Sequence, residues 1–210
     1  MRMLAIETAS EACSIALFEG EALIASDHRT IGRGHAEALV PMIGALPDKG
    51  RAARILVSLG PGSFTGVRIG LATARALGFA WSAEVLGYPT LALIAAQARA
   101  AHPGQALTVC TNGGHGEWFV ADFTASGLAQ GETVSITPDA ARSRPRAMLI
   151  AGNRAEAMAA LDPALGATSV DLLPDARAVP LVPAALLTSA LAPIYGRGPD
   201  ATPMAARLPA

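Results

Sequence analysis

One stretch, residues 55–79, decides the fold of this chain and reads ILVSLGPGSFTGVRIGLATARALGF. Its first five residues are apolar and β-branched enough to form a short buried strand. Glycines interrupt the run at residues 60–66, and the residues that follow favour a helix. Strand, glycine loop and helix therefore succeed one another directly.

The glycine loop has two interpretations. Unpaired backbone N–H groups at a helix N-terminus attract anions, so the loop could hold a phosphate. However, the spacing Gly60-x-Gly62-x-x-x-Gly66 matches neither the dinucleotide fingerprint nor the Walker loop, and no lysine follows it. A purely structural tight turn is the alternative.

The helix after the loop carries a ridge of small residues. Gly66, Gly70, Ala74 and Gly78 fall four apart, so they share one face along which another backbone can approach closely. A glycine costs roughly 1 kcal/mol relative to alanine in a helix interior, which indicates that the ridge has a packing role. Because the helix is apolar nearly all round, we expect its own sheet on one side and a second helix, from this chain or a partner, on the other.

Composition narrows the class of protein. The 210 residues can form one two-lobed domain or two small ones. A net charge of −1 gives no basic footprint, so a partner should hold any nucleic acid. No apolar run approaches the roughly 20 residues of a membrane span, and the N-terminus does not resemble a signal peptide, so we expect a cytoplasmic protein without membrane contact. Cys13 and Cys110 lie in strand-like runs and should be buried thiols.

The apolar patterns predict two similar halves. We expect strands at 3–8, 13–18, 22–26, 55–59 and 85–88 and helices at 35–46, 66–79 and from 90 to the His102-Pro103-Gly104 break. The second half should have strands at 107–111, 117–123, 133–136 and 148–151 and helices at 154–161 and 181–191. This divides the chain into an N-terminal lobe, 1–104, and a C-terminal lobe, 105–210, with a frayed tail beyond Gly196.

Several of these segments closely resemble the TsaB (YeaZ) family over nearly the whole chain: residues 59–70, Leu4–Ala9, His35-Ala36-Glu37 and Pro193–Arg197. The resemblance implies an α/β fold of the two-lobed actin, sugar kinase and Hsp70 superfamily, which is ribonuclease H-like with mixed sheets flanked by helices. It also implies a subunit needed to make N6-threonylcarbamoyladenosine (t6A) at position 37 of tRNAs that read codons starting with A.

The same resemblance implies a non-catalytic scaffold. In that family a TsaD-like paralogue performs the transfer, a TsaE-like ATPase joins the complex, and tRNA is engaged only through the complex. No intrinsic cofactor is implied, with ATP or ADP expected at the subunit interface. The catalytic paralogue binds a metal through a helical His-x-x-x-His pair. This chain has Thr90 and Ile94 at the matching place, so we expect no metal site and no catalytic residues.

Two departures from the family pattern stand out. An Asp-Ala-Arg before the second-lobe hairpin is replaced by Thr111–Glu117, where charges have become neutral residues and glycines. The first-strand acid is Glu7 in place of the usual aspartate and should offer a carboxylate at the hairpin mouth.

We expect the first-lobe helices to pack against the equivalent helices of a TsaD-like partner, and against a second copy when the partner is absent. On this hypothesis Gly70→Arg breaks association, whereas an insoluble variant would mean that the ridge packs inside the chain. The predicted partner-binding residues are Leu39, Met42, Ile43, Leu46, Gly66, Gly70, Thr73, Ala74 and Leu77.

Two other functions fit parts of the sequence. The superfamily fold allows an ATP-dependent enzyme with phosphates at Thr8–Ser10 and Gly113-Gly114. A peptidase acting on the partner would use Ser63, which lacks the Gly-x-Ser-x-Gly spacing and an evident histidine base. His35 and Glu37 do not share a helix face, which disfavours an acid–base pair. The candidate nucleotide or anion residues are Thr8, Ser10, Gly62 and Ser63.

Overall fold

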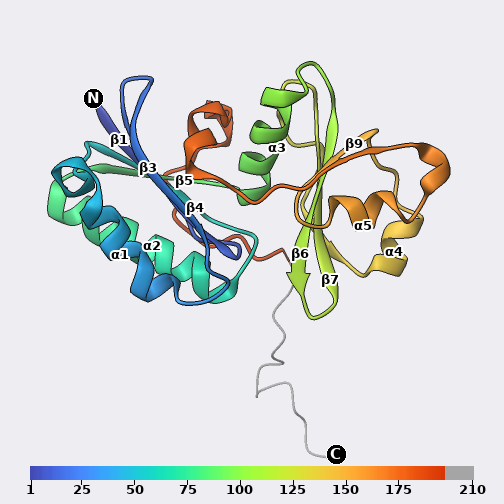
Figure 1. Cartoon of the computed structure of the whole chain (residues 1–210), viewed down its shortest axis with the longest axis horizontal. Coiled ribbons are helices and arrows are strands. Elements are labelled where there is room, and N and C mark those ends of the chain that lie inside the picture. Colours follow the sequence, from blue (N-terminus) through green and yellow to red (C-terminus); the bar gives the residue numbers. More distant parts are fainter. Residues whose placement is uncertain (197–210) are drawn as a thin grey trace, which may run out of the picture.

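The computed structural model describes residues 1–196 and contains two five-stranded sheets, one in each half of the chain (Figure 1). The first sheet has the order β3-β2-β1-β4-β5. Strands β1, β2 and β3 are antiparallel neighbours, while β4 and β5 run parallel to β1. Their bounds are β1 Arg2–Glu7, β2 Ala12–Glu19, β3 Ala22–Thr30, β4 Arg54–Ser58 and β5 Glu84–Tyr88.

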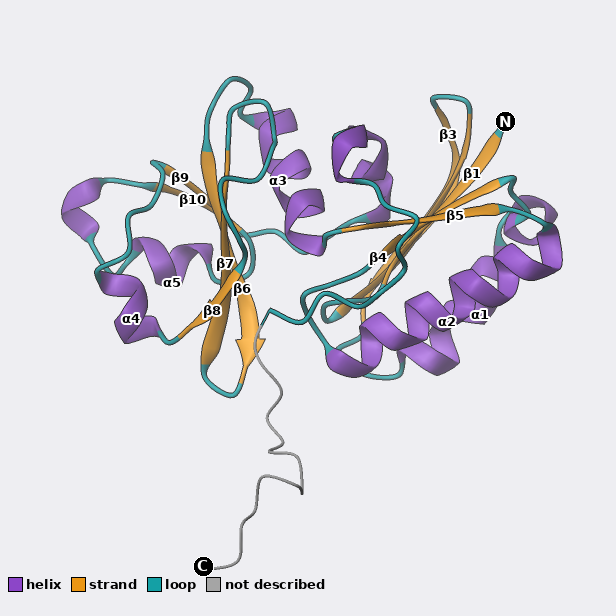
Figure 2. Cartoon of the chain, turned by 180° about the vertical axis from the view of Figure 1, so that it is seen from behind, coloured by secondary structure: helices purple, strands orange, loops and turns teal. Residues whose placement is uncertain are grey.

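Helices cover both faces of the first sheet. Helices α1 (His35–Ala45) and α2 (Phe64–Trp81) lie side by side on one face, and α3 (Thr90–Ala101) lies on the other, between the two sheets (Figure 2). Alternate side chains of β1 and β4 point to opposite faces of the sheet and pack in the core on each face, as expected for strands of period two. Leu4 and Ile6 pack beneath α1 and α2, whereas Ala5 and Leu56 join the core around α3.

The second sheet repeats the topology of the first. Reversing its order gives β8-β7-β6-β9-β10, with β6–β7–β8 antiparallel and β9 and β10 parallel to β6. The predicted α/β fold of two mixed sheets flanked by helices is confirmed. The elements are β6 Leu107–Gly114, β7 Glu117–Phe123, β8 Val134–Ile136, α4 Pro138–Arg142, β9 Leu149–Ala151, α5 Ala155–Ala159 and β10 Thr168–Val170.

The end of the described chain differs from the prediction. The prediction of a helix at 181–191 is wrong. Residues 176–186 instead contain two short 3-10 turns, η3 (Ala176–Leu181) and η4 (Ala184–Leu186). The chain is extended at Thr188, because its backbone exchanges hydrogen bonds with Gly87 instead of continuing a helix. The sequence also missed α4 and β10, which are too short and too exposed to carry a pattern. The predicted frayed tail beyond Gly196 lies outside the described residues.

The segment after β10 returns to the first sheet. The η3 turn packs against α3 and against β1, β2 and β3. Thr188 then forms an isolated antiparallel bridge with Gly87 at the β5 edge. Other short 3-10 turns are η1 (Pro47–Gly50) and η2 (Pro163–Leu165). Both cysteines are buried and unpaired, as predicted, and within 1–196 no helix has the length and apolar character to cross a bilayer.

Candidate functional site

The glycine ridge of α2 faces the chain's own first sheet. A Cβ on Gly66 would overlap the Thr8 carbonyl oxygen, and a Cβ on Gly70 would overlap the Thr8 side-chain oxygen. The Thr8 hydroxyl donates to the Gly66 carbonyl at 2.8 Å. The close backbone approach that the ridge predicted therefore occurs within the chain, between α2 and the end of β1.

This arrangement corrects the expected partner surface. Leu39, Met42 and Ile43 of α1 and Leu46, which caps its C-terminus, are buried in one core cluster with residues of β1, β2 and β4. On α2, Gly66, Gly70 and Ala74 are buried, while Thr73 and Leu77 are partly buried. Gly70→Arg should therefore damage the fold, the outcome that indicates an inward-facing ridge.

The outer surface of α1 and α2 is apolar and built of small residues. Phe79 is 91% exposed and Val40 61% exposed. An exposed apolar patch, in contrast to a single exposed apolar side chain, often marks an interaction site. Partner binding by these two helices stays a prediction, and we name the side chains that could carry it the helix-pair surface: Ala36, Val40, Pro41, Gly44, Ala45, Ala72, Ala76, Phe79 and Ala80.

The glycine loop holds α2 close to the β1–β2 turn. Ser63 is the N-cap of α2, because its hydroxyl accepts from the Gly66 N–H at 3.1 Å. The Ser63 N–H donates to the Ala9 carbonyl at 2.7 Å, and a Cβ on Gly62 would overlap that same Ala9 oxygen. The structure thus gives the loop the tight-turn role, with Ser63 satisfying the helix end.

A cleft of about 820 Å³ lies between the two halves of the molecule. Ser10, Gly62 and Ser63 line it from the first half, and Gly113 and Gly114 line it from the second. The cleft thus brings together all but one of the predicted anion residues. Thr8 does not line it, because its side chain is buried against Gly66.

The end of β6 and the turn that follows it form one wall of the cleft. Thr111–His115 line it, and the Asn112 side chain accepts from the Gly114 N–H at 3.2 Å. Across the cleft, Asn153 donates to the Glu11 carboxylate at 2.8 Å, while its side-chain oxygen accepts from the Asn112 N–H at 2.9 Å. Asn153 therefore joins the two halves, a role the sequence did not reveal.

The cleft mouth carries an arginine between two aromatic rings. The Arg68 guanidinium carbon lies 3.2 Å from the centroid of the Phe64 ring and 5.3 Å from that of Tyr195. Its Nη2 donates to the Tyr195 hydroxyl at 2.5 Å. Such stacking is favourable for a guanidinium over an aromatic face. Among the cleft-lining residues within 1–196, Arg68 contributes a guanidinium and Glu11 a carboxyl group.

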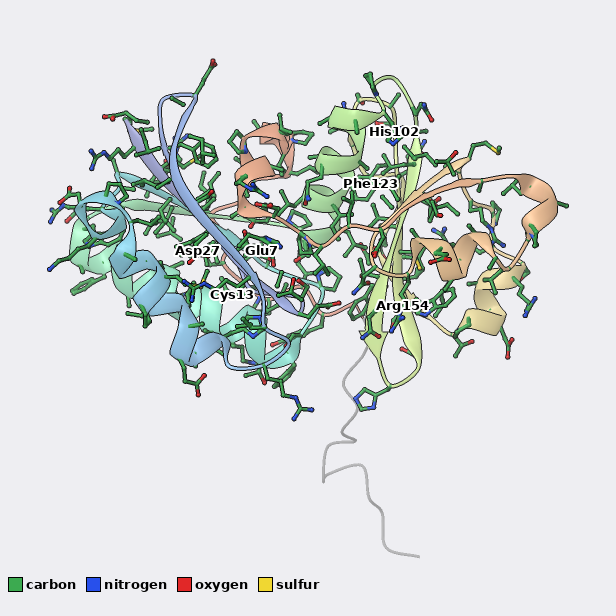
Figure 3. All side chains as sticks on the ribbon, in the orientation of Figure 1. Glu7, Cys13, Asp27, His102, Phe123 and Arg154 are labelled. Carbon is green, nitrogen blue, oxygen red and sulfur yellow. The ribbon has the colours of Figure 1, made fainter. Side chains whose placement is uncertain are left out.

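Glu7 lies beneath this site and is fully buried in the first sheet (Figure 3). The loss of hydration raises the pKa of its carboxyl from 4.5 to about 7, although hydrogen bonds from Ala9, Ser58 and Tyr88 offset part of the rise. The Ala9 N–H donates to its Oε1 at 2.7 Å. The expectation of a carboxylate at the hairpin mouth is therefore wrong, because the β1–β2 turn encloses the group.

The raised pKa predicts a pH-dependent stability. Because the folded state holds the Glu7 proton more tightly, stability should fall as pH rises from 4.5 to about 7, by an upper bound of about 3 kcal/mol. Glu7→Gln should remove this decline and be the more stable form at pH 8. The measurement is urea unfolding of both proteins across this pH range. Parallel stability curves would contradict the assignment.

The remaining candidates for chemistry have structural contacts. His35 Nε2 lies 3.2 Å from the Ala12 carbonyl oxygen, and the Thr90 hydroxyl lies 2.5 Å from that of Ser58. Ile94 contributes an apolar part of the cleft wall. Within residues 1–196, no three histidine, cysteine or acidic side chains are grouped so that they could hold a metal ion.

The comparisons with known proteins agree with one another. A family model described as TsaD, tRNA N6-adenosine threonylcarbamoyltransferase, matches residues 28–178. The tRNA threonylcarbamoyladenosine biosynthesis protein TsaB of Escherichia coli K12 is 32% identical over 139 residues, which are 63% of this chain and 60% of that protein. The Bacillus subtilis 168 protein of the same name is 34% identical over 90 residues, 40% of this chain and 38% of that protein.

A solved structure is similar over a greater length. It is a Pseudomonas aeruginosa protein described as uncharacterised, with similarity to peptidase YEAZ. The TM-score is 0.76 at 25% identity, covering 93% of this chain and 99% of that one. The match to the Escherichia coli sequence, in contrast, spans about three fifths of that relative's length.

Proposed function

This chain belongs to the TsaB (YeaZ) family, and from this we propose that it takes part in forming t6A at position 37 of tRNAs that read codons starting with A. Relatives that carry the TsaB name are tRNA threonylcarbamoyladenosine biosynthesis proteins. The matching family model describes the threonylcarbamoyltransferase itself. Within that pathway we assign this chain the role of a non-catalytic subunit that binds a TsaD-like catalytic subunit.

The observation that carries the proposal is the helix-pair surface. Phe79, almost fully exposed, lies near Ala72, Ala76 and Ala80 of α2, and α2 covers the same face of the sheet as α1, which carries the exposed Val40. Two adjacent helices of 11 and 18 residues can offer an area near the roughly 800 Å² per partner of a standard interface. Small side chains let a partner's helices approach closely, giving a four-helix packing. Without the partner, the same surface should pair with a second copy.

A non-catalytic role is supported by what the reactive side chains contact. Ser63 caps α2, His35 lies against a backbone carbonyl, and Thr90 is paired with Ser58. A nucleophile needs a base within hydrogen-bond reach, and Ser63 instead accepts the Gly66 N–H. These contacts disfavour the peptidase hypothesis.

The wider assembly follows from the same reasoning. The net charge is −1, so the chain has no excess of positive charge with which to bind tRNA phosphates. We therefore expect tRNA to be engaged through the complex. A TsaE-like ATPase would join the TsaB–TsaD pair, with ATP or ADP at the subunit interface. Phe64 and Arg68 of α2 line the cleft, which supports a nucleotide position near the proposed interface.

The test is a reconstituted modification assay. It contains a TsaD-like subunit, the ATPase, threonylcarbamoyl-adenylate and tRNA, with or without this chain, and mass spectrometry follows the modified adenosine. We expect t6A only when the chain is present, at an unchanged level with Ser63→Ala. If t6A forms equally without the chain, the scaffold role is wrong; if Ser63→Ala removes t6A while the variant stays folded, the serine has a chemical role.

The cleft supports a second candidate, a nucleotide site in this chain. Its volume is within the range of small-molecule pockets, and Ser10, Gly62, Ser63, Gly113 and Gly114 surround it. Against a triphosphate, Arg68 is the one arginine or lysine among its described lining residues. Calorimetry with ATP on the isolated chain decides this. Micromolar binding would favour the ATP-dependent enzyme. If no heat of binding is measured, the isolated chain has no ATP site, and a nucleotide could bind only at the subunit interface.

A further inference from the structure

Residues 187–196, which we call the strap, run along the first lobe and end at the cleft. Thr188 exchanges two backbone hydrogen bonds with Gly87, at 2.7 and 3.0 Å, and the Ile194 N–H donates to the Leu59 carbonyl at 2.7 Å. The last three residues line the cleft. A Cβ on Gly196 would overlap the Phe119 ring of β7, so the strap ends against the second lobe. The end of the strap therefore forms part of the cleft wall and reaches from the first lobe to the second.

Two exposed arginines of α2 hold the strap. Arg75 Nη2 donates to the Leu191 carbonyl at 2.7 Å, and Arg68 Nη2 donates to the Tyr195 hydroxyl. The two arginines are seven residues apart, which is about two helical turns, so they lie on the same side of α2. Ala72 and Phe79 continue that exposed stripe. The side chains that fasten the strap therefore belong to the edge of the helix-pair surface.

Both fastening hydrogen bonds use neutral acceptors. A guanidinium bonds more strongly to a carboxylate than to a carbonyl or a phenol oxygen, and the bond can be bidentate. A partner helix that places carboxylates opposite Arg68 and Arg75 would compete for the same donors. Bonds to the partner would then replace the two arginine bonds to the strap, which would keep only its backbone bonds and the partly buried Leu191 and Ile194.

We propose that Arg68 and Arg75 hold the strap in the cleft wall, and that docking of an acidic partner helix on α2 releases it and opens the cleft. The release rests on the proposed function, because it requires a partner on the helix-pair surface. Coupling of this kind is reciprocal, so whatever fills the opened cleft would strengthen binding of the partner.

The first experiment needs no partner. Amide hydrogen exchange at Ile194 and Thr188, followed by NMR, reports opening of the strap. Arg75→Ala should speed exchange at Ile194 by roughly tenfold, since it removes the hydrogen bond that a charged group of α2 donates to the strap. Arg99→Ala is the matched control, because Arg99 also donates to a backbone carbonyl, that of Ala125, but in α3. Unchanged exchange at Ile194 in Arg75→Ala overturns the fastening role.

The second experiment adds the TsaD-like subunit to the full chain and scores co-elution separately from exchange. In the complex, exchange at Ile194 should rise by roughly tenfold, as in Arg75→Ala. Co-elution with unchanged or slower exchange at Ile194 overturns the release but leaves the proposed function intact. Absence of co-elution overturns the proposed function and the release together, while the Arg75→Ala result still decides whether α2 fastens the strap.

Discussion

Gly66→Ala is expected to destabilise the protein by about 3 kcal/mol, the upper end of the cost of overpacking. The new methyl group would overlap the Thr8 carbonyl oxygen, which belongs to the backbone and cannot rotate away. Neither side can easily yield. Thr8 follows β1, the central strand of the first sheet, and its hydroxyl is bonded to the Gly66 carbonyl. Any shift of α2 would also disturb the Ser63 cap.

Gly44→Ala is the control for this change. Gly44 lies in α1, and a Cβ there meets nothing within 4 Å. The same substitution should therefore be neutral or stabilising by up to about 1 kcal/mol, since alanine favours the helix. Urea unfolding of the two variants and the parent protein measures the difference. Equal midpoints for all three would show that α2 does not approach β1 as closely as described.

Local sequence was sufficient to predict most of the fold. The period-four glycines predicted a helix with one closely packed face, and the apolar runs located every strand of the two sheets except β10. The covering surface could not be predicted, because spacing defines which residues share a face and not what lies against it. Gly70 was therefore predicted to contact a partner, whereas a Cβ there would overlap the Thr8 side-chain oxygen at the end of β1.

The site was less predictable because its contacts are distant in sequence. Arg68 and Tyr195 are 127 positions apart, and Glu11 and Asn153 are 142 apart. The family motif at Pro193–Arg197 marked this region without giving its role. The prediction of a helix at 181–191 failed because its apolar residues suit a helix, while the backbone of Thr188 pairs with Gly87 at the edge of β5 and holds that part of the chain extended.

Phe79→Glu should abolish stable association with a TsaD-like subunit while leaving the chain folded. An aromatic side chain at the centre of an interface commonly contributes about 2 kcal/mol or more, so we expect at least a roughly thirtyfold loss of affinity. A carboxylate buried there without a partner would add a desolvation cost. Because Phe79 is 91% exposed in the chain alone, its stability should change by less than about 1 kcal/mol, including the unfavourable charge near the helix C-terminus.

Met148→Glu provides the comparison, since Met148 is also a large exposed apolar residue, but lies beside β9 in the other lobe. Co-elution and t6A formation should persist in Met148→Glu and be lost together in Phe79→Glu. Because the modification assay requires the chain only through its partner, loss of t6A with intact co-elution would indicate a role for Phe79 after assembly. Retention of both by Phe79→Glu would remove the helix-pair surface as the docking site and direct the search to the strap and the cleft mouth, where Phe64 and Arg68 are the next exposed groups of α2.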